Sequence, residues 1–261
     1  MRPFNKMEVN MGLVKEFFIQ LYSIKDETQK DFVGSIKKLS SLGYNGVEFA
    51  YDNGGLSAKE MKDLLNGCGM SSIGAHVGGN ELKDNLDKII EFHAEIGTKY
   101  IICPGFGSET KDGWLKFAEA SNKIGERVKA AGMLFGYHNH AHEFTQSHDG
   151  ETVFDIYFGN TDADLVKAEI DFYWTAHAGV PALPLIEKYG KRLDLVHVKQ
   201  MKDFESKQCT DLDSGFVDYK TITEAVVKHG VVKGFVLEQE EFPNRPIWDA
   251  LLANREYINS L

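Results

Sequence analysis

The chain has 261 residues, of which 43% are hydrophobic and 26% charged. These fractions lie near the average for globular proteins and exclude disordered, collagen-like and fibrous chains. The formal net charge of −10 and the scattered lysines argue against nucleic acid as a partner. Because no stretch approaches the roughly 18 apolar residues of a membrane helix and the first residues lack a signal-peptide core, we expect a soluble, cytoplasmic protein with no membrane partner. A periplasmic location stays open if a leader has been removed.

The three cysteines, Cys68, Cys103 and Cys209, are far apart in the sequence. Their number and spacing fit neither a zinc knuckle nor a disulfide scaffold, so we expect reduced thiols. A nucleophilic role for one of them stays open.

Short apolar runs alternate with segments of helical periodicity along the chain. We expect strands at 16–22, 46–50, 72–76, 100–103, 133–137, 165–171, 193–199 and 234–238. We expect helices at 31–42, 57–67, 82–96, 112–131, 153–158, 183–189, 219–229 and 247–258. Ser57 with Glu60 three residues later has the spacing of a capping box and marks one helix start.

Eight such units average about 33 residues each, which is the size of a βαβ building block. The pattern predicts an α/β fold with a single domain over residues 1–261, a closed (β/α)8 TIM barrel. The alternative is an open doubly wound sheet. Its dinucleotide-binding form is disfavoured because neither a G-x-G-x-x-G motif after the first strand nor a P-loop is present.

The densest group of chemically active side chains follows the fifth expected strand, in the stretch from Phe135 to Phe144. Residues 138–143 hold three histidines, an asparagine and a glutamate. Histidine has a pKa near neutrality and two ring nitrogens, so it suits ligand or acid–base roles. We therefore expect this stretch to contribute to a functional site.

Catalytic groups of a (β/α)8 barrel lie at the C-terminal ends of its strands. The ionisable residues at the expected strand ends are Glu48, His76, His138, His140, Glu143, Asp171, His197, Lys199, Glu238 and Glu240. Each has an ordinary structural explanation on its own, such as a rim carboxylate or half of a salt bridge. In a barrel, however, they would all surround one mouth.

A ring of glutamate, aspartate and histidine side chains suits a divalent metal ion. Mn²⁺, Mg²⁺ and Co²⁺ accept one imidazole among oxygen donors, and Zn²⁺ also stays open. No cysteine occupies these positions, which favours an open, catalytic site over a closed structural zinc site.

Six motifs carry a resemblance to a known family. They are Gln20-Leu-Tyr-Ser, Gly43-Tyr-Asn-Gly-Val-Glu48, Tyr137-His-Asn-His with Glu143-Phe144, Glu169-Ile-Asp-Phe-Tyr-Trp174, His197-Val-Lys199 and Leu237-Glu-Gln-Glu240. In these motifs and their order the chain resembles the sugar isomerase/epimerase superfamily with a xylose-isomerase-like TIM barrel. That superfamily also includes inosose dehydratases and endonuclease IV-like enzymes.

The resemblance implies a metal held by one residue from each of strands five to eight. Carried over to this chain, the ligands are Glu143, Asp171, His197 and Glu238. Many members of the superfamily place the strand-five ligand where His138 stands here. Alternation along an ideal strand also puts Glu143 on the opposite side from His138, unless the strand ends before it.

The resemblance further implies an isomerase or epimerase that removes a proton beside a sugar carbonyl and passes through an enediolate. The candidate bases are His140, His138 and Glu48, and Lys199 is a candidate for a hydrogen bond to a substrate oxygen. Trp174 offers an apolar face to a sugar ring, although core or rim packing is its commoner role. His76 and Glu240 are further candidates for substrate contacts.

Two alternatives accompany this interpretation. The Tyr137-His-Asn-His form resembles a subgroup acting on oxidised sugars, which implies a metal-dependent 3-keto-glycoside lyase or hydrolase, or a keto-inositol dehydratase. From a different class, the chain is a non-catalytic sugar-binding barrel. An endonuclease is disfavoured, because its trinuclear zinc site needs further histidines and the chain is acidic.

The substrate expected from this interpretation is a small sugar. The chain has five arginines, at 2, 127, 192, 245 and 255, and they form no phosphate cradle, which favours an unphosphorylated substrate. The oligomeric state stays open, with a homo-oligomer among the options.

Overall fold

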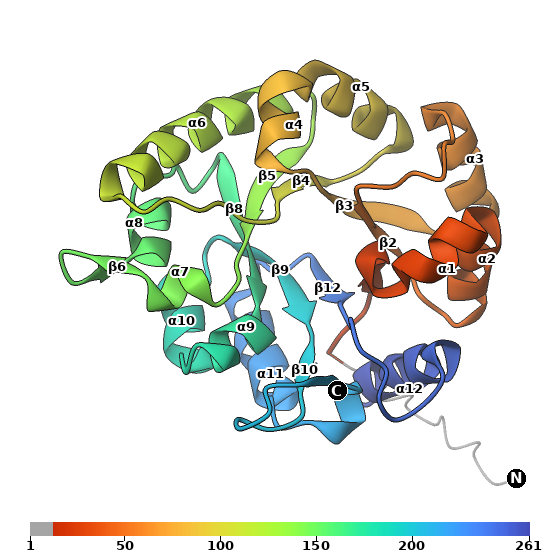
Figure 1. Cartoon of the computed structure of the whole chain (residues 1–261). Helices are drawn as coiled ribbons and strands as arrows, with labels where there is room; N and C mark the ends of the chain where they lie inside the picture. The colour runs from red at the N-terminus through yellow and green to blue at the C-terminus, as the bar shows by residue number, and fades with distance from the viewer. Residues whose placement is uncertain (1–12) are drawn as a thin grey trace, which may run out of the picture.

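The computed structural model describes residues 13–261. Eight parallel strands close into a barrel in the order β1-β12-β9-β8-β5-β4-β3-β2, and helices surround it (Figure 1). The strands are β1 (Phe17–Gln20), β2 (Gly46–Ala50), β3 (Ser71–His76), β4 (Tyr100–Cys103), β5 (Leu134–His138), β8 (Val166–Asp171), β9 (Leu193–Val198) and β12 (Gly234–Leu237). The predicted TIM barrel is thus confirmed, and each strand ends within two residues of its expected position.

The outer layer consists mainly of helices. They are α1 (Lys25–Lys30), α2 (Phe32–Ser41), α3 (Ala58–Gly67), α4 (Gly79–Asp84), α5 (Leu86–Ile96), α6 (Lys111–Ala130), α7 (His142–Thr145), α8 (Val153–Gly159), α9 (Phe172–His177), α10 (Ala182–Tyr189), α11 (Tyr219–His229) and α12 (Ile247–Asn259). Two 3-10 turns, Leu21–Ile24 and Leu212–Ser214, and two short hairpins complete the connections. The hairpins pair β6 (Ser147–His148) with β7 (Glu151–Thr152) and β10 (Gln200–Met201) with β11 (Cys209–Thr210).

Local signals explain several helix ends. The Ser57 side chain accepts the Glu60 backbone N–H, and the Glu60 carboxylate accepts the Ser57 backbone N–H, which confirms the capping box at α3. The helix expected over 82–96 is instead two helices, because Asn85 adopts a non-helical conformation between α4 and α5. Gly97 ends α5 in the left-handed conformation that glycine adopts without strain.

The inward faces of the strands change character along the barrel axis. Near the N-terminal ends, the inward side chains form a separate apolar cluster, called here the lower layer. Its members are Phe18, Ile73, Tyr100, Ile102, Leu195 and Val236. Toward the C-terminal ends, buried polar side chains such as Gln20, Glu48 and His197 take over. The site therefore lies at the C-terminal end, as expected for this fold.

Two further sequence expectations bear on the fold. The three cysteines are free, and Cys103 and Cys209 are buried. Over residues 13–261, no helix is both long and apolar enough to cross a bilayer.

Candidate metal centre

Two overlapping groups of buried side chains at the C-terminal end of the barrel have metal-ligand spacing. The outer group is His138, Asp171, His197 and Glu238, and the inner group is His76, His138, Glu169 and His197. In each group, one potential ligand atom per residue lies within 4.8 Å of all the others. The two groups share two histidines, so the contacts of those rings decide which group presents ligands to the mouth.

The Asp171 carboxylate has one oxygen fixed and one free. It ends β8 and caps α9, where its Oδ1 accepts the backbone N–H groups of Tyr173 at 2.8 Å and Trp174 at 3.3 Å. Within residues 13–261, its buried Oδ2 has no hydrogen-bond partner. Burial raises the pKa of this carboxyl to about 7. A buried, oriented oxygen without a partner fits a metal ligand, since a cation would offset this desolvation.

The two shared histidines each have one ring nitrogen held by a carboxylate of the barrel interior. His138 Nδ1 lies 3.1 Å from Glu169 Oε2, and His197 Nε2 lies 2.8 Å from Glu48 Oε2. The other nitrogen of His197, Nδ1, lies 3.0 Å from Glu238 Oε2 in the outer group. Carboxylates in this position fix the ring orientation and tautomer of metal-binding histidines. The arrangement favours the outer group as the ligand set.

Glu48 and Glu169 form a charged network beneath the outer group. The Nε2 atom of His76 lies 2.8 Å from Glu169 Oε2 and 3.1 Å from Glu48 Oε2. Burial opposes ionisation of Glu48, but the charges of His76 and His197 hold its pKa well below the usual range. Burial raises the pKa of Glu169 to about 7, and the charge of Glu48 adds to that effect. The pKa of His76 is about 10, because the two carboxylates outweigh its desolvation.

Neighbouring residues make room for this network and complete it. Gln20 Nε2 donates to Glu48 Oε2 at 2.8 Å. Gly74 lies opposite Glu48 on the adjacent strand, and a Cβ atom there would clash with Glu48 Oε1. A larger residue at position 74 would therefore displace the Glu48 carboxylate from this network.

A cavity of about 340 Å³, called here the mouth cavity, opens above the outer group. Its lining residues include Tyr22, Tyr51, His76, His138, His140, Trp174, Glu238 and Glu240. Burial lowers the pKa of His140 to about 4, so its ring is neutral near pH 7. The Trp174 indole lies 5.2 Å from the His140 ring, and its buried Nε1–H has no acceptor among the described residues. The cavity thus contains an uncharged imidazole with an indole ring beside it.

Lys199 lies beneath one wall of this cavity. Its Nζ atom forms an ion pair with Glu240, lies 3.5 Å from Glu238 Oε1, and sits 4.9 Å from the ring centres of Tyr173 and Trp174. Burial lowers the pKa of Lys199, but the surrounding carboxylates raise it by more. Lys199 is therefore a fixed cation next to the outer group.

The structure places Glu143 outside both groups, contrary to the expected ligand set. Strand β5 ends at His138, and Glu143 lies on α7. Its Oε1 accepts the Tyr137 hydroxyl at 2.7 Å, and its Oε2 accepts the His140 backbone N–H at 2.8 Å. His138 stands with the other three residues in its place. Glu143 instead fixes the backbone that carries His140.

The structure also shows residues that the sequence reasoning passed over. Glu169 and Gln20 lie within the motifs but were not candidate site residues. Glu169 precedes Asp171 by two positions, so alternation along β8 would have placed both on the inward face. The role of His142 stayed undefined, and its Nε2 lies 2.8 Å from the Phe106 carbonyl oxygen.

Comparisons with known proteins agree with this architecture. An inosose dehydratase from Lacticaseibacillus casei is 25% identical over 217 residues, covering 76% of this chain and 67% of that protein. An inosose dehydratase from Clostridium perfringens is 27% identical over 144 residues, which are 55% of this chain and 43% of its length. Thus the C. perfringens match spans less than half of that relative.

A solved structure of a sugar phosphate isomerase/epimerase from Parabacteroides distasonis is 25% identical, with a TM-score of 0.78, over 93% of this chain and 96% of that chain. The sequence model of one family, described as the xylose isomerase-like TIM barrel, matches residues 36–257. That match covers most of the closed barrel and all four residues of the outer group. The chain therefore belongs to the xylose isomerase-like TIM barrel family.

Proposed function

We propose that this protein is a metal-dependent isomerase or epimerase that removes a proton from the carbon beside the carbonyl of a small sugar or cyclitol. The observation that carries the proposal is the outer group, in which the free Asp171 Oδ2 and two oriented histidines lie directly below the mouth cavity. The relatives with curated functions are enzymes, which adds support.

The residues of the outer group fit a divalent ion. When bound there, the ion would polarise a substrate carbonyl and make the neighbouring C–H more acidic. Two imidazoles and two carboxylates suit Mn²⁺, Co²⁺ or Zn²⁺ better than Mg²⁺, which prefers oxygen ligands. We propose His138 as the ligand from β5 in place of Glu143.

We propose His140 as the base that takes the substrate proton. It lines the mouth cavity, and burial keeps it neutral, so a ring nitrogen is available to accept a proton. Of the other candidates, His138 belongs to the outer group and Glu48 is fully buried in the network below. Both therefore have positioning or ligand roles in this proposal.

Lys199 and Trp174 would position the substrate. The Lys199 ammonium stabilises negative charge that develops on a substrate oxygen, since Glu240 and Glu238 hold it next to the outer group. The Trp174 ring offers the substrate an apolar face. Glu240 and His76 complete the lining of the cavity.

The charge of the mouth cavity supports an unphosphorylated substrate. Its described lining includes the carboxylates of Glu238 and Glu240 and no lysine or arginine. A phosphate group would meet negative charge there, and the nearest ammonium group, that of Lys199, is already paired with Glu240 and lies 3.5 Å from Glu238 Oε1.

Solvent exchange tests the proposed reaction. Metal-loaded protein incubated with a panel of keto-sugars and keto-inositols in D₂O is expected to introduce deuterium beside the carbonyl of at least one compound, as observed by NMR. His140→Gln should slow this exchange about 100-fold or more. His142→Gln is the matched control, because His142 is absent from the mouth-cavity lining. Metal-loaded protein that exchanges no compound would contradict the proposal and favour a sugar-binding barrel.

A second candidate is elimination after the same proton removal. The two curated relatives described above are inosose dehydratases, and loss of a hydroxyl or glycosidic oxygen would give a dehydratase or a 3-keto-glycoside lyase. An enone absorbance or a released aglycone would identify this outcome. Exchange without either product supports isomerisation or epimerisation.

A further inference from the structure

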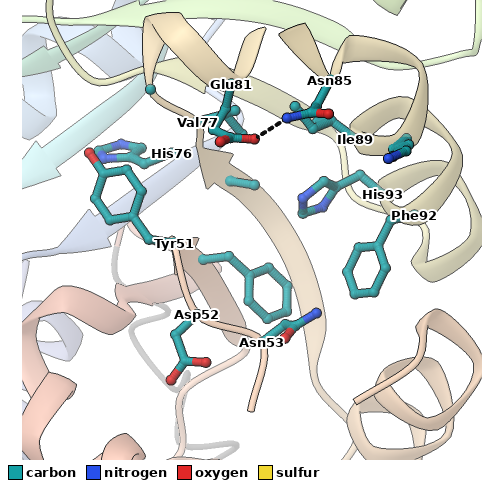
Figure 2. A pocket seen from close by; sticks show the side chains of 14 residues that line it. Tyr51, Asp52, Asn53, His76, Val77, Glu81, Asn85, Ile89, Phe92 and His93 are labelled. Carbon is teal, nitrogen blue, oxygen red and sulfur yellow. Dashed lines mark hydrogen bonds between the residues drawn. The ribbon is translucent and has the colours of Figure 1, made fainter. Parts of the chain in front are cut away.

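A second cavity, called here the side cavity, adjoins the mouth cavity and plays no part in the proposed proton transfer. It has a volume of about 660 Å³, within the range of about 300–1,000 Å³ typical of ligand pockets. It lies between the ends of β2 and β3 on one side and helices α4 and α5 on the other (Figure 2).

The two cavities share two wall residues, Tyr51 and His76. Figure 2 shows the Tyr51 ring beside His76, with His93 and Phe92 of α5 farther along the side cavity. Tyr51 is 71% exposed and has a φ of 60°, a left-handed backbone that a bulky residue seldom adopts. Such strain is retained where the surrounding structure or the function requires it. Tyr51 therefore stands where a ligand would pass from one cavity to the other.

The side cavity has an apolar wall, although Asp52, Asn53, Glu81, Asn85 and Lys88 also line it. Phe49 and Val77 are buried, and Ile89 and Phe92 add partly buried apolar surface from α5. Two buried polar side chains also line it: His76, at the boundary with the mouth cavity, and His93, which is 9% exposed. The Nδ1 atom of His93 lies 3.0 Å from Thr98 Oγ1, whereas its Nε2 makes no hydrogen bond within the part of the chain that the structure describes. A flat apolar group with one polar atom matches these walls.

The charges around the side cavity disfavour an anionic occupant. Its charged lining residues are Asp52, Glu81, Lys88 and His76, and the charge of His76 is already paired with the Glu48 and Glu169 carboxylates. Glu81 already accepts a hydrogen bond from Asn85 Nδ2 at 2.8 Å, which fixes this side of the rim (Figure 2). His93 adds no positive charge near pH 7, because burial lowers its pKa to about 4. A phosphate or carboxylate would therefore meet the Asp52 and Glu81 carboxylates, with Lys88 as the one lysine of the described lining.

We propose that the substrate carries an uncharged aromatic substituent, which lies in the side cavity while its sugar or cyclitol ring lies in the mouth cavity. This inference rests on the proposed function for the position of the ring, and on the side cavity itself for the substituent. The substituent passes Tyr51, packs against Phe49 and Phe92, and presents its polar atom to His93 Nε2.

Binding of two neutral probes to the metal-loaded protein tests the proposal without turnover. Phenyl β-D-glucopyranoside should bind about tenfold more tightly than methyl β-D-glucopyranoside, because an apolar pocket discriminates added apolar surface by at least this factor. Ile89→Trp fills the side cavity and should remove the difference while leaving the methyl glycoside unchanged. Glu91→Trp, an exposed position on the same helix that does not line the cavity, should preserve both affinities.

A measurement on the wild-type protein avoids dependence on the folding of a variant. With ¹³C-labelled isoleucine methyl groups, the phenyl glycoside should shift the Ile89 resonance and the methyl glycoside should not. Equal affinity of the two probes, or an Ile89 resonance that neither moves, would overturn the proposal. A failed deuterium exchange with retained phenyl selectivity would instead overturn the proposed reaction and leave the side cavity as a binding site.

Discussion

The two ends of the barrel interior differ sharply although the same strands build them. Phe18 of β1 and Leu195 of β9 belong to the apolar lower layer, and two residues later the same inward faces carry Gln20 and His197. Successive inward positions of a strand are two residues apart, so one strand supplies an apolar contact and then a polar group. Burial of the lower layer stabilises the fold, whereas burial of the charged upper network costs free energy unless it is paired. One end serves stability, and the other carries the candidate site.

The largest expected effect is a loss of metal affinity, and it should arise from a substitution at the upper end of the barrel but not at the lower end. Asp171→Asn should lower the affinity for Mn²⁺ or Co²⁺ more than about 100-fold, because it removes the charge of a proposed ligand while its Oδ1 can still cap α9. Titration calorimetry measures this. Asp194→Asn is the matched control, since Asp194 is a buried carboxylate near the opposite end of the barrel, where it accepts the Tyr100 hydroxyl at 2.9 Å. An equal loss of metal affinity in both variants would contradict the proposed metal centre.

The second largest effect is expected on stability, from a substitution in the lower layer. Phe18→Ala should reduce the free energy of unfolding by about 3–5 kcal/mol, because it leaves a cavity in a fully buried apolar cluster. Urea unfolding measures the change. The metal affinity of the folded variant should stay at the wild-type value. A large loss of metal affinity would show that the two layers are not separable.

A smaller effect is expected beneath the outer group. Glu48→Gln should lower metal affinity about 10–100-fold, because it weakens the contact that orients His197 without removing a ligand of the outer group. Glu60→Gln, on the exposed capping box of α3, is the control for loss of a carboxylate. An affinity for Mn²⁺ equal to that of wild type would assign Glu48 a purely structural role.

The smallest effect is a pH dependence from the lower end. Burial raises the pKa of Asp194 above its ordinary value of 3.8. As the pH rises from about 4, the unfolded chain therefore releases this proton before the folded protein does. The group thus lowers stability with rising pH until the folded pKa is passed. Asp194→Asn should remove this contribution, so its stability relative to wild type should increase between pH 4 and 7 in thermal unfolding. If the difference in stability between Asp194→Asn and wild type did not change with pH, the raised pKa of Asp194 would be contradicted.

The sequence predicted the barrel well because its strands are short apolar runs, and the proposed ligands follow those runs. Asp171, His197 and Glu238 were identified as ligand candidates, and the outer group includes all three. Local patterns placed the end of β5 within one residue, but they did not predict α7, the short helix that carries Glu143 outside the outer group. Nor did they reveal that Glu169 contacts His76, since 93 residues separate the two in sequence. The side cavity depends on how α4 and α5 pack, which periodicity does not specify.

Gly74 has a consequence for engineering this protein. A strand position is ordinarily stabilised by a β-branched residue, and glycine there carries an entropic cost. Here a larger side chain would displace the Glu48 carboxylate and, through it, the ring of His197. A redesign that optimised β3 by strand propensity alone would thus gain rigidity at the expense of the contacts that orient His197 in the proposed metal centre.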